Sequence, residues 1–295
     1  MLIFKASIGT LFFIGDCMIL IMPDNYNQIV ENVNLYDGII LSIEKFSVNS
    51  RYKINLKELK KILKIINDKE IYISINKNIE DNELDDLENI LFELNNYKIN
   101  GVIYSDAAVL TYKNKLKYKL IWGQEHLVTN YETINYYVNL GIDGAYLSSD
   151  ITKEEINEII DKTNTKIFIN LFGYIPMFVS KRNIVKNYLK NFNIKSKSEV
   201  YYMKKEGKIY PIVDQDLTYV YANNIFNGIA EYFNIKSDYY ICNGFLIENE
   251  KFNEILSLIN NLNKKDVKKI SKKVDSMFIN IDTGFLYKET VSKIK

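Results

Sequence analysis

The sequence has few of the residues that hold metal clusters and disulfide frameworks. Its 295 residues include two cysteines, Cys17 and Cys242, and a single histidine, His126. Two distant cysteines cannot alone form a four-cysteine zinc site or hold a four-iron cluster. A disulfide framework is also not expected in a chain of this length. We therefore expect two reduced core thiols, no cofactor and no iron–sulfur cluster.

Arginine is equally scarce, because Arg51 and Arg182 are the only two in the chain. The sequence is rich in Ile, Asn, Lys and Tyr, a composition in which drift favours lysine over arginine. Each arginine is therefore a candidate functional residue.

The chain has neither a large excess of one charge nor an apolar run of membrane length. Its 38 basic residues are balanced by 37 acidic ones, which argues against a strongly basic nucleic-acid binder but leaves room for a local patch. The apolar stretch from Ile8 to Met22 is interrupted by Asp16 and is too short to span a bilayer, so we interpret it as two β-strands. We expect a cytoplasmic protein with no membrane partner.

Short β-branched runs alternate with longer segments of helical periodicity through most of the sequence. Strands are expected at residues 17–22, 38–43, 70–75, 101–104, 116–121, 144–147, 166–171 and 239–242. Helices are expected at residues 25–33, 56–67, 82–95, 131–140 and 152–162. The apolar runs are continuous, as in parallel strands covered on both faces. This pattern favours a (βα)8 TIM-type barrel. The alternative, an open doubly wound sheet, lacks its glycine-rich phosphate fingerprint here.

Residues 200–220 break this alternation. Glu206 and Gly207 predict a hairpin turn between two tyrosine-rich strands, VYYMKK and KIYPIVD. We expect a β-hairpin inserted at about 198–222, before the last barrel strand. A lysine-rich stretch, interpreted as a solvated segment, and an extra strand in INIDTGFLY form a closing segment at about 264–295. With no long Pro/Gly/Ser linker, residues 1–295 are expected to form one domain.

Several segments together resemble peptidase family U32, the collagenase-like peptidases. DGIILSIEKFSVNSR resembles the family's second strand and loop, and EIYISINKNIEDNEL resembles the strand that ends at an asparagine, here Asn76. INGVIYSDAAVL matches a pattern whose acid falls on Asp106, and YKLIWGQEHLVTN resembles a strand followed by an amide, here Asn130. GIDGAYLSSDITKEEINEI also resembles a family segment, while GYIPMFVSKRN and DTGFLYKETV resemble a short branch without cysteines. The order of these segments along nearly the whole chain supports the resemblance.

The resemblance implies a barrel with peptidase activity of unassigned catalytic type. Other members resemble factors for the hydroxylation of tRNA, ribosomal RNA or ubiquinone precursors, and those carry a four-cysteine iron–sulfur cluster. In this chain GYIPMFVSKRN, where the cysteine pattern would begin, contains no cysteine. The resemblance therefore does not extend to cluster chemistry.

Residues that follow the strands of such a barrel face one common pocket. On this rule the candidate catalytic residues are Asp106, Glu125 and His126, with His126 as a general base oriented by a neighbouring acid. The alternatives are a half-exposed loop histidine and, for Asp106, a cap of the following helix. These three residues lack HExxH-type metal spacing, so no metal site is expected. No G-x-S-x-G motif occurs, so the sequence does not support a catalytic serine triad.

The same rule collects a set of polar candidates for substrate binding: Arg51, Asn76, Gln124, Asn130, Asn170, Lys181 and Arg182. We interpret Ser180 as an N-cap, which places Lys181 and Arg182 in a first helical turn, where the helix dipole disfavours cations. A bound anion would offset that cost, and such barrels commonly bind phosphate after strands seven and eight. The alternative is a solvated basic face.

Two functions are therefore expected. The leading one is a U32-like peptidase or hydrolase with a polar, anion-binding pocket, acting on a peptide or a small anionic substrate. The alternative is a cluster-free RNA-modification factor or a partner-binding factor, with RNA as a partner. A homo-oligomer and a complex with a paralogous partner are both left open.

Overall fold

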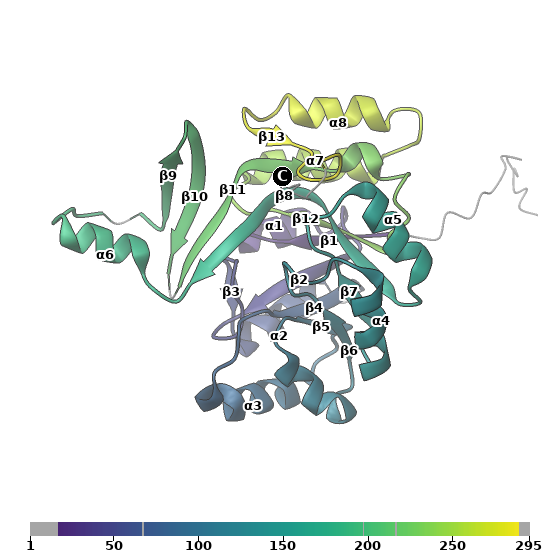
Figure 1. The fold of residues 1–295 in the computed structure, drawn as a ribbon, viewed down its shortest axis with the longest axis vertical. Helices are drawn as coiled ribbons and strands as arrows, with labels where there is room; N and C mark the ends of the chain where they lie inside the picture. The colour runs from purple at the N-terminus through teal and green to yellow at the C-terminus, as the bar shows by residue number, and fades with distance from the viewer. Residues whose placement is uncertain (1–16, 67, 197, 216, 289–295) are drawn as a thin grey trace, which may run out of the picture.

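The computed structural model describes residues 17–66, 68–196, 198–215 and 217–288. Parallel strands form a closed barrel in the order β1 (Met18–Met22), β2 (Gly38–Ile43), β4 (Glu70–Ile75), β5 (Gly101–Tyr104), β6 (Lys119–Trp122), β7 (Gly144–Tyr146), β8 (Lys166–Ser180) and β12 (Tyr239–Asn243). Strand β12 closes the ring because it pairs with both β8 and β1 (Figure 1). The predicted TIM-type barrel is confirmed. Strand β6 begins at Lys119 rather than at residue 116 as expected, and a 3-10 helix, η2 (Ala107–Lys115), precedes it.

Helices between the strands cover the outside of the barrel. They are α1 (Tyr26–Glu31), α2 (Leu56–Ile65), α3 (Leu84–Leu94), α4 (Tyr131–Leu140), α5 (Lys153–Lys162) and α7 (Asn249–Asn260), with short 3-10 turns η1 (Asp81–Glu83) and η3 (Ile229–Glu231). The five predicted helices are confirmed, with ends displaced by a few residues. Side-chain caps explain several starts: Thr152 and Glu155, for example, form a reciprocal capping box at α5.

The barrel interior is filled by one side chain from most strands. This inner cluster consists of Leu20, Ile40, Tyr72, Ile103, Ile121, Phe168, Tyr239 and Ile241. The rings of Phe168 and Tyr239 stack with centroids 4.1 Å apart, and Tyr72 meets Phe168 edge-on at 5.3 Å. A larger cluster lies between the strands and the outer helices. Strands buried on both faces explain why their apolar runs do not alternate.

Strand β8 continues well beyond the barrel, which the sequence did not predict. It leaves at Gly173, where φ is +118° and a Cβ would lie 2.3 Å from the carbonyl oxygen of Asn243. Beyond this point β8 pairs antiparallel with β11 (Thr218–Asn227), β11 with β10 (Lys208–Asp214), and β10 with β9 (Val200–Lys205). Helix α6 (Ile184–Asn191) connects β8 to β9. We call the outer part of β8 together with α6, β9, β10 and β11 the arm, which projects from the barrel in Figure 1.

The inserted hairpin is confirmed, although it is part of this larger sheet. Glu206 and Gly207 both have positive φ, 53° and 79°, as a type I′ hairpin turn requires. Register then places Lys205 opposite Lys208, immediately outside the turn. The hairpin is therefore the outer half of the arm rather than an isolated ribbon.

The closing segment packs beside the arm. Helix α8 (Val267–Asp275) is followed by β13 (Ile281–Asp282), the extra strand expected, which pairs with β11; a second short strand, β3 (Lys53–Ile54), pairs with β2. Residues 289–295 of the closing segment lie outside the described residues, as do residues 8–16 of the two strands expected at the N-terminus. Within the part that is described, no helix is both long and apolar enough to cross a membrane.

Candidate functional site

The carboxyl ends of the barrel strands surround an open cavity of about 1010 Å³. Strand parity explains its floor, because Asn170 lies two positions after the inward-facing Phe168, and Asn243 two positions after Ile241. The loops after the strands supply the walls. The lining residues are Met22, Val48, Asn49, Asn76, Asn78, Ser105, Gly123, Gln124, Glu125, His126, Leu127, Tyr146, Leu147, Ser149, Asn170, Pro176, Val179 and Asn243.

Side-chain amides dominate the polar part of this lining. They are Asn49, Asn76, Asn78, Gln124, Asn170 and Asn243. Among the described lining residues there is no lysine or arginine, and the two titratable groups besides Tyr146 are Glu125 and His126. Asn76, Asn170 and Asn243 have both amide groups hydrogen-bonded within the protein. The amide groups left for a ligand among the described lining residues are those of Asn78 and Gln124 and the Oδ1 of Asn49. This neutral polar lining differs from the basic lining that an anion-binding pocket was expected to have.

Glu125 is the carboxyl of the cavity. Its pKa is raised to about 7, chiefly by burial; the charge of His126 lowers the pKa and that of Asp150 raises it. Its Oε2 accepts a hydrogen bond of 3.1 Å from Nδ2 of Asn49. Near neutral pH the side chain is therefore divided between a protonated donor and an ionised acceptor.

His126 lies at the edge of the cavity with both ring nitrogens beside acceptors. Nδ1 is 3.0 Å from Oδ2 of Asp150, and Nε2 is 3.2 Å from the carbonyl oxygen of Met177. Desolvation lowers the pKa of His126, but the hydrogen bond to Asp150 and the charges of Glu125 and Asp150 outweigh it and raise the pKa overall. Two acceptors favour the doubly protonated ring, which has no lone pair for general base catalysis. This arrangement suits a proton donor or a cation rather than the expected base.

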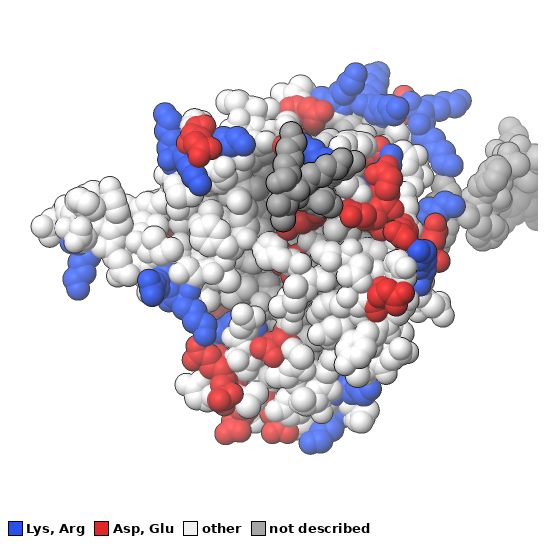
Figure 2. All heavy atoms as spheres, viewed as in Figure 1, with Lys and Arg blue, Asp and Glu red and all other residues white. Residues whose placement is uncertain are grey.

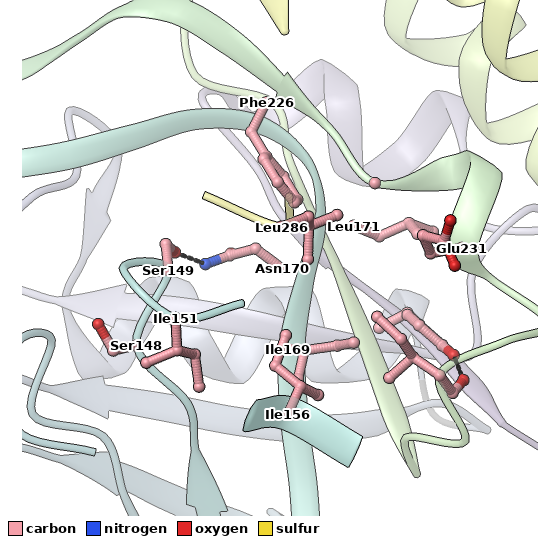
Figure 3. Close-up of a pocket in the computed structure, with 13 residues that line it drawn as sticks. Ser148, Ser149, Ile151, Ile156, Ile169, Asn170, Leu171, Phe226, Glu231 and Leu286 are labelled. Atoms are coloured by element: carbon pink, nitrogen blue, oxygen red, sulfur yellow. Dashed lines mark hydrogen bonds between the residues drawn. The ribbon is translucent and has the colours of Figure 1, made fainter. Parts of the chain in front are cut away.

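Asn170 is oriented by its neighbours on the cavity floor. Its Oδ1 accepts from the hydroxyl of Tyr146 at 2.6 Å, and its Nδ2 donates to Oγ of Ser149 at 2.7 Å. Figure 3 shows the Asn170–Ser149 hydrogen bond among the residues that line a smaller pocket, together with Ile169, Phe226 and other apolar side chains. These two residues therefore form a partition between the cavity and the apolar pocket behind it.

Asn76 holds a loop in place. Its Oδ1 accepts from the amide of Val48 at 2.8 Å, while its Nδ2 donates to the carbonyl of Val48 at 3.1 Å. Both amide functions are used by the backbone of the loop after β2, which carries Asn49 into the cavity. Asn76 is thus placed at the site as expected, but it positions the lining.

Two of the predicted residues lie outside the cavity and cap helices. Asp106 Oδ1 accepts from the amide of Ala108 at the start of η2, and its Oδ2 accepts from the amide of Ile79. Asn130 Oδ1 accepts from the amide of Thr133 and caps α4. For Asp106 the structure agrees with the capping alternative, and neither side chain is brought to the other candidates.

The three predicted cations also lie outside the cavity. Arg51 forms an ion pair with Asp24, a carboxylate that is 3% exposed. Lys181 forms an ion pair with Glu80 near the rim. The predicted helix start at Ser180 is wrong: α6 begins at Ile184 with Asn183 as its N-cap residue, so Lys181 and Arg182 precede the helix. The dipole argument for Arg182 therefore no longer applies, because this residue lies before the helix. Its side chain is exposed on the arm.

A second cavity of about 1030 Å³ adjoins the first beneath the arm. His126, Ser149 and Pro176 line both. The second cavity extends to Lys208 and Tyr210 on β10 and to the closing segment at Phe285. The two cavities therefore lie side by side, separated by the residues that line both.

Comparison with known proteins identifies the family to which this barrel belongs. The sequence model of peptidase family U32 matches residues 29–198, which is more than half of the chain. The chain belongs to this family. The match includes most of the barrel strands and ends within the arm.

Two relatives of this U32 chain are informative. It is 27% identical over 248 residues to tRNA hydroxylation protein P2 of Bacillus subtilis (strain 168), covering 75% of this chain and 80% of that protein. The solved structure of the U32 peptidase Mk0906 superposes with a TM-score of 0.51 at 13% identity, covering 82% of this chain and 96% of that one. The second likeness supports the shared fold alone.

The donor set of this U32 chain does not fit a four-cysteine cluster. Cys17 contacts the hydroxyl of Tyr232 at 2.9 Å, and Cys242 is buried within β12, where burial raises the pKa of its thiol. Among the described residues, no three His, Cys, Asp or Glu side chains come together as potential metal ligands.

Sequence reasoning missed Asn49, Asn78, Tyr146 and Asn243 as lining residues. For Asn243 a signal existed, because it continues the inward positions of Tyr239 and Ile241 one step beyond the predicted strand. Asn49 could not be found this way, since its place depends on a left-handed φ of 57° within the loop after β2.

Proposed function

We propose that this U32 protein acts in RNA modification, as a factor for tRNA hydroxylation whose barrel cavity receives a nucleobase. The alignment with tRNA hydroxylation protein P2 covers three quarters of the chain. The observation that carries the proposal is the set of lining amide groups without a protein partner among the described residues: Gln124, Asn78 and the Oδ1 of Asn49. Asparagine and glutamine side chains present a donor and an acceptor side by side, which is the pattern that base edges offer.

Several features of the cavity support a base as the ligand. Asn49 Oδ1 is buried and has no hydrogen-bond partner among the described residues, so a bound donor would remove the cost of leaving it unpaired. Glu125, with its pKa of about 7, can donate or accept near neutral pH. A bound base does not need a lysine or arginine in the described lining, because the phosphate of its nucleotide would remain outside the cavity.

The same geometry offers less support for peptide hydrolysis. Acyl-transfer chemistry by a hydroxyl needs a nucleophile within reach of a base. Ser105 Oγ donates to the carbonyl of Gly123, and Ser149 Oγ accepts from Asn170. The described contacts of His126 are to Asp150 and Met177 rather than to either serine.

The proposal is tested by deleting the gene in its own organism and measuring hydroxylated nucleosides in tRNA digests by mass spectrometry. We expect these nucleosides to fall and to be restored by the wild-type chain. Variants that change the cavity, Gln124→Ala and Asn170→Ala, should restore them poorly, whereas Tyr136→Ala on the outer face of α4 should restore them fully. Unchanged hydroxylation in the deletion strain, together with peptide cleavage by the purified protein, would contradict the proposal.

A further inference from the structure

Helix α6 of the arm is held by hydrogen bonds at its start, not by apolar packing. The amide of Ile184 donates to Oγ1 of Thr218 at 2.9 Å, and the amide of Lys186 donates to Oδ2 of Asp214 at 2.7 Å. None of the helix residues is buried. A helix of eight residues is too short to be stable alone, so these contacts fix its place. Ile184 and Tyr188 are exposed, whereas Val185 and Leu189 are partly buried.

The arm exposes aromatic rings that a folded domain ordinarily covers. The exposed fractions are 45% for Phe178, 56% for Tyr188, 58% for Phe192 and 64% for Tyr202. Tyr188 and Phe192 lie one helical turn apart, with ring centroids separated by 4.7 Å. These rings lie on three successive segments of the arm: the end of β8, the α6 region and β9. Exposed apolar groups gathered in this way indicate a binding surface.

The part of the arm from Met177 to Ile209 carries a strong excess of positive charge. Between Met177 and Ile209 there are nine lysines and arginines but two acidic residues, a net charge of +7. The rest of the chain keeps 29 basic and 35 acidic residues, a net charge of −6. In Figure 2 blue side chains stand at the hairpin end and along the lower edge of the arm, with uncharged surface between them. The balanced net charge of the chain therefore conceals a basic arm.

The arm is continuous with the cavity through one strand. β8 contributes Asn170 to the cavity floor and Val179 to its rim, and the adjacent Phe178 is exposed on the arm. His126 contacts the backbone of Met177 at the point where the two meet. A nucleotide with its base in the cavity would thus place its neighbours along the arm.

We propose that the arm binds the single-stranded RNA segment that flanks the base held in the cavity. The exposed rings stack on bases, and the lysines between them contact phosphates. This inference rests on the proposed function, and it adds the surface that selects RNA. Charge favours RNA over a protein partner, because rings and lysines interleave along the arm and phosphate supplies negative charge at every nucleotide.

The test measures binding of purified wild-type protein to unfractionated tRNA by fluorescence anisotropy at several salt concentrations. The double variant Tyr188→Ala/Phe192→Ala should bind about 10-fold to 100-fold more weakly, the range expected for the loss of base stacking. Lys190→Glu/Lys195→Glu should weaken binding and flatten its salt dependence. The matched controls are Tyr136→Ala, with a ring 62% exposed on α4, and Lys268→Glu/Lys269→Glu on α8. Both controls should bind like wild type.

The outcomes separate this inference from the proposed function. Loss of tRNA binding in both arm variants with folded, wild-type-like circular dichroism supports it. If the arm variants bind tRNA normally, the arm proposal is wrong. The proposed function in tRNA hydroxylation still stands in that case, provided that the wild-type gene restores hydroxylation in the deletion strain. If arm variants bind tRNA normally but fail to restore hydroxylation, the arm is a protein-docking surface instead. If wild-type protein does not bind tRNA at all, the arm proposal also fails.

Discussion

The side chain of Asn49 donates a hydrogen bond of 3.1 Å to Oε2 of Glu125, which joins the loop after β2 to the loop after β6 across the mouth of the barrel. Asn49 has a left-handed backbone, a conformation that asparagine tolerates better than most residues. The pair therefore depends on a strained loop position, and it fixes the one carboxyl that lines the described cavity.

The first prediction concerns stability and pH through Glu125. Its pKa rises on folding from 4.5 to about 7, chiefly through burial, so the folded state binds an extra proton in this window. The free energy of unfolding should therefore fall as the pH rises from about 4.5 to 7. Glu125→Gln should be more stable than wild type at pH 8 by about 1–3 kcal/mol, and the difference should shrink at pH 4.5. Urea denaturation at both pH values measures it.

A matched control for this effect is Glu132→Gln, an exposed carboxyl in the first turn of α4. It should not reproduce the pH-dependent gain. A Glu125→Gln variant that is equally destabilised at both pH values would show that packing, rather than the proton, determines the result.

The second prediction concerns the pKa of His126. Because it is the only histidine in the chain, its ring signals in an NMR spectrum belong to one residue. Because two acceptors and nearby carboxylates favour its charged form, its pKa should exceed 6.5 in an NMR titration of the ring Cε1–H signal. Any stability it contributes is present below pH 6.5 and is lost as pH rises through the higher, folded pKa. Asp150→Asn should lower the measured pKa. A wild-type value below 6.5 would mean that desolvation outweighs both partners.

The third prediction concerns Asn76 and the loop that it holds. Asn76→Ala leaves the amide and carbonyl of Val48 without their partners, which should cost about 1–3 kcal/mol of folding free energy. Asn78→Ala is the control, since Asn78 lines the same cavity from an exposed position. Equal stability of the two variants, measured by thermal unfolding, would contradict the positioning role.

The fourth prediction concerns the buried ion pair of Arg51 and Asp24. Burial raises the pKa of Asp24, while the hydrogen bond and charge of Arg51 lower it. Arg51→Met would leave a carboxylate buried without its partner, and we expect a loss of about 3 kcal/mol. Asp24→Asn/Arg51→Met should recover much of that loss. If Arg51→Met melts like wild type but weakens ligand binding, the arginine serves the ligand instead.

The fifth prediction concerns metal content. With two cysteines, one of them inside a strand, the chain cannot supply four thiolates to a cluster. Purified protein should be colourless, and elemental analysis should find far less than four irons per chain. Four irons per chain with a brown colour would require ligands that this structure does not indicate.

The barrel could be predicted because its strands and helices follow local rules. The continuous apolar runs of β2, β4 and β5 begin and end where the strands do, and the cap residue Thr152 marks the start of α5. The length of β8 could not be predicted, because residues beyond Gly173 are ordered by pairing with β11, more than forty positions away in several pairs. The start of α6 was missed for a similar reason, since its caps, Asp214 and Thr218, are distant in sequence.

The site was predicted in part because strand ends converge in any barrel. That rule brought Asn76, Gln124, Glu125, His126 and Asn170 together, as the structure does. It could not tell which polar side chains are already used locally. Asp106 and Asn130 cap helices instead, a difference that only their hydrogen bonds reveal.

One strand serves both the barrel and the arm. Because β8 passes from its barrel partners to β11 at Gly173, no flexible linker separates Asn170 from Phe178. Gly173 also packs against the backbone of Asn243, so the bend is fixed by contact as well as by its left-handed φ. The cavity floor and the exposed face of the arm therefore belong to one continuous strand, and their spacing is set by the backbone of β8.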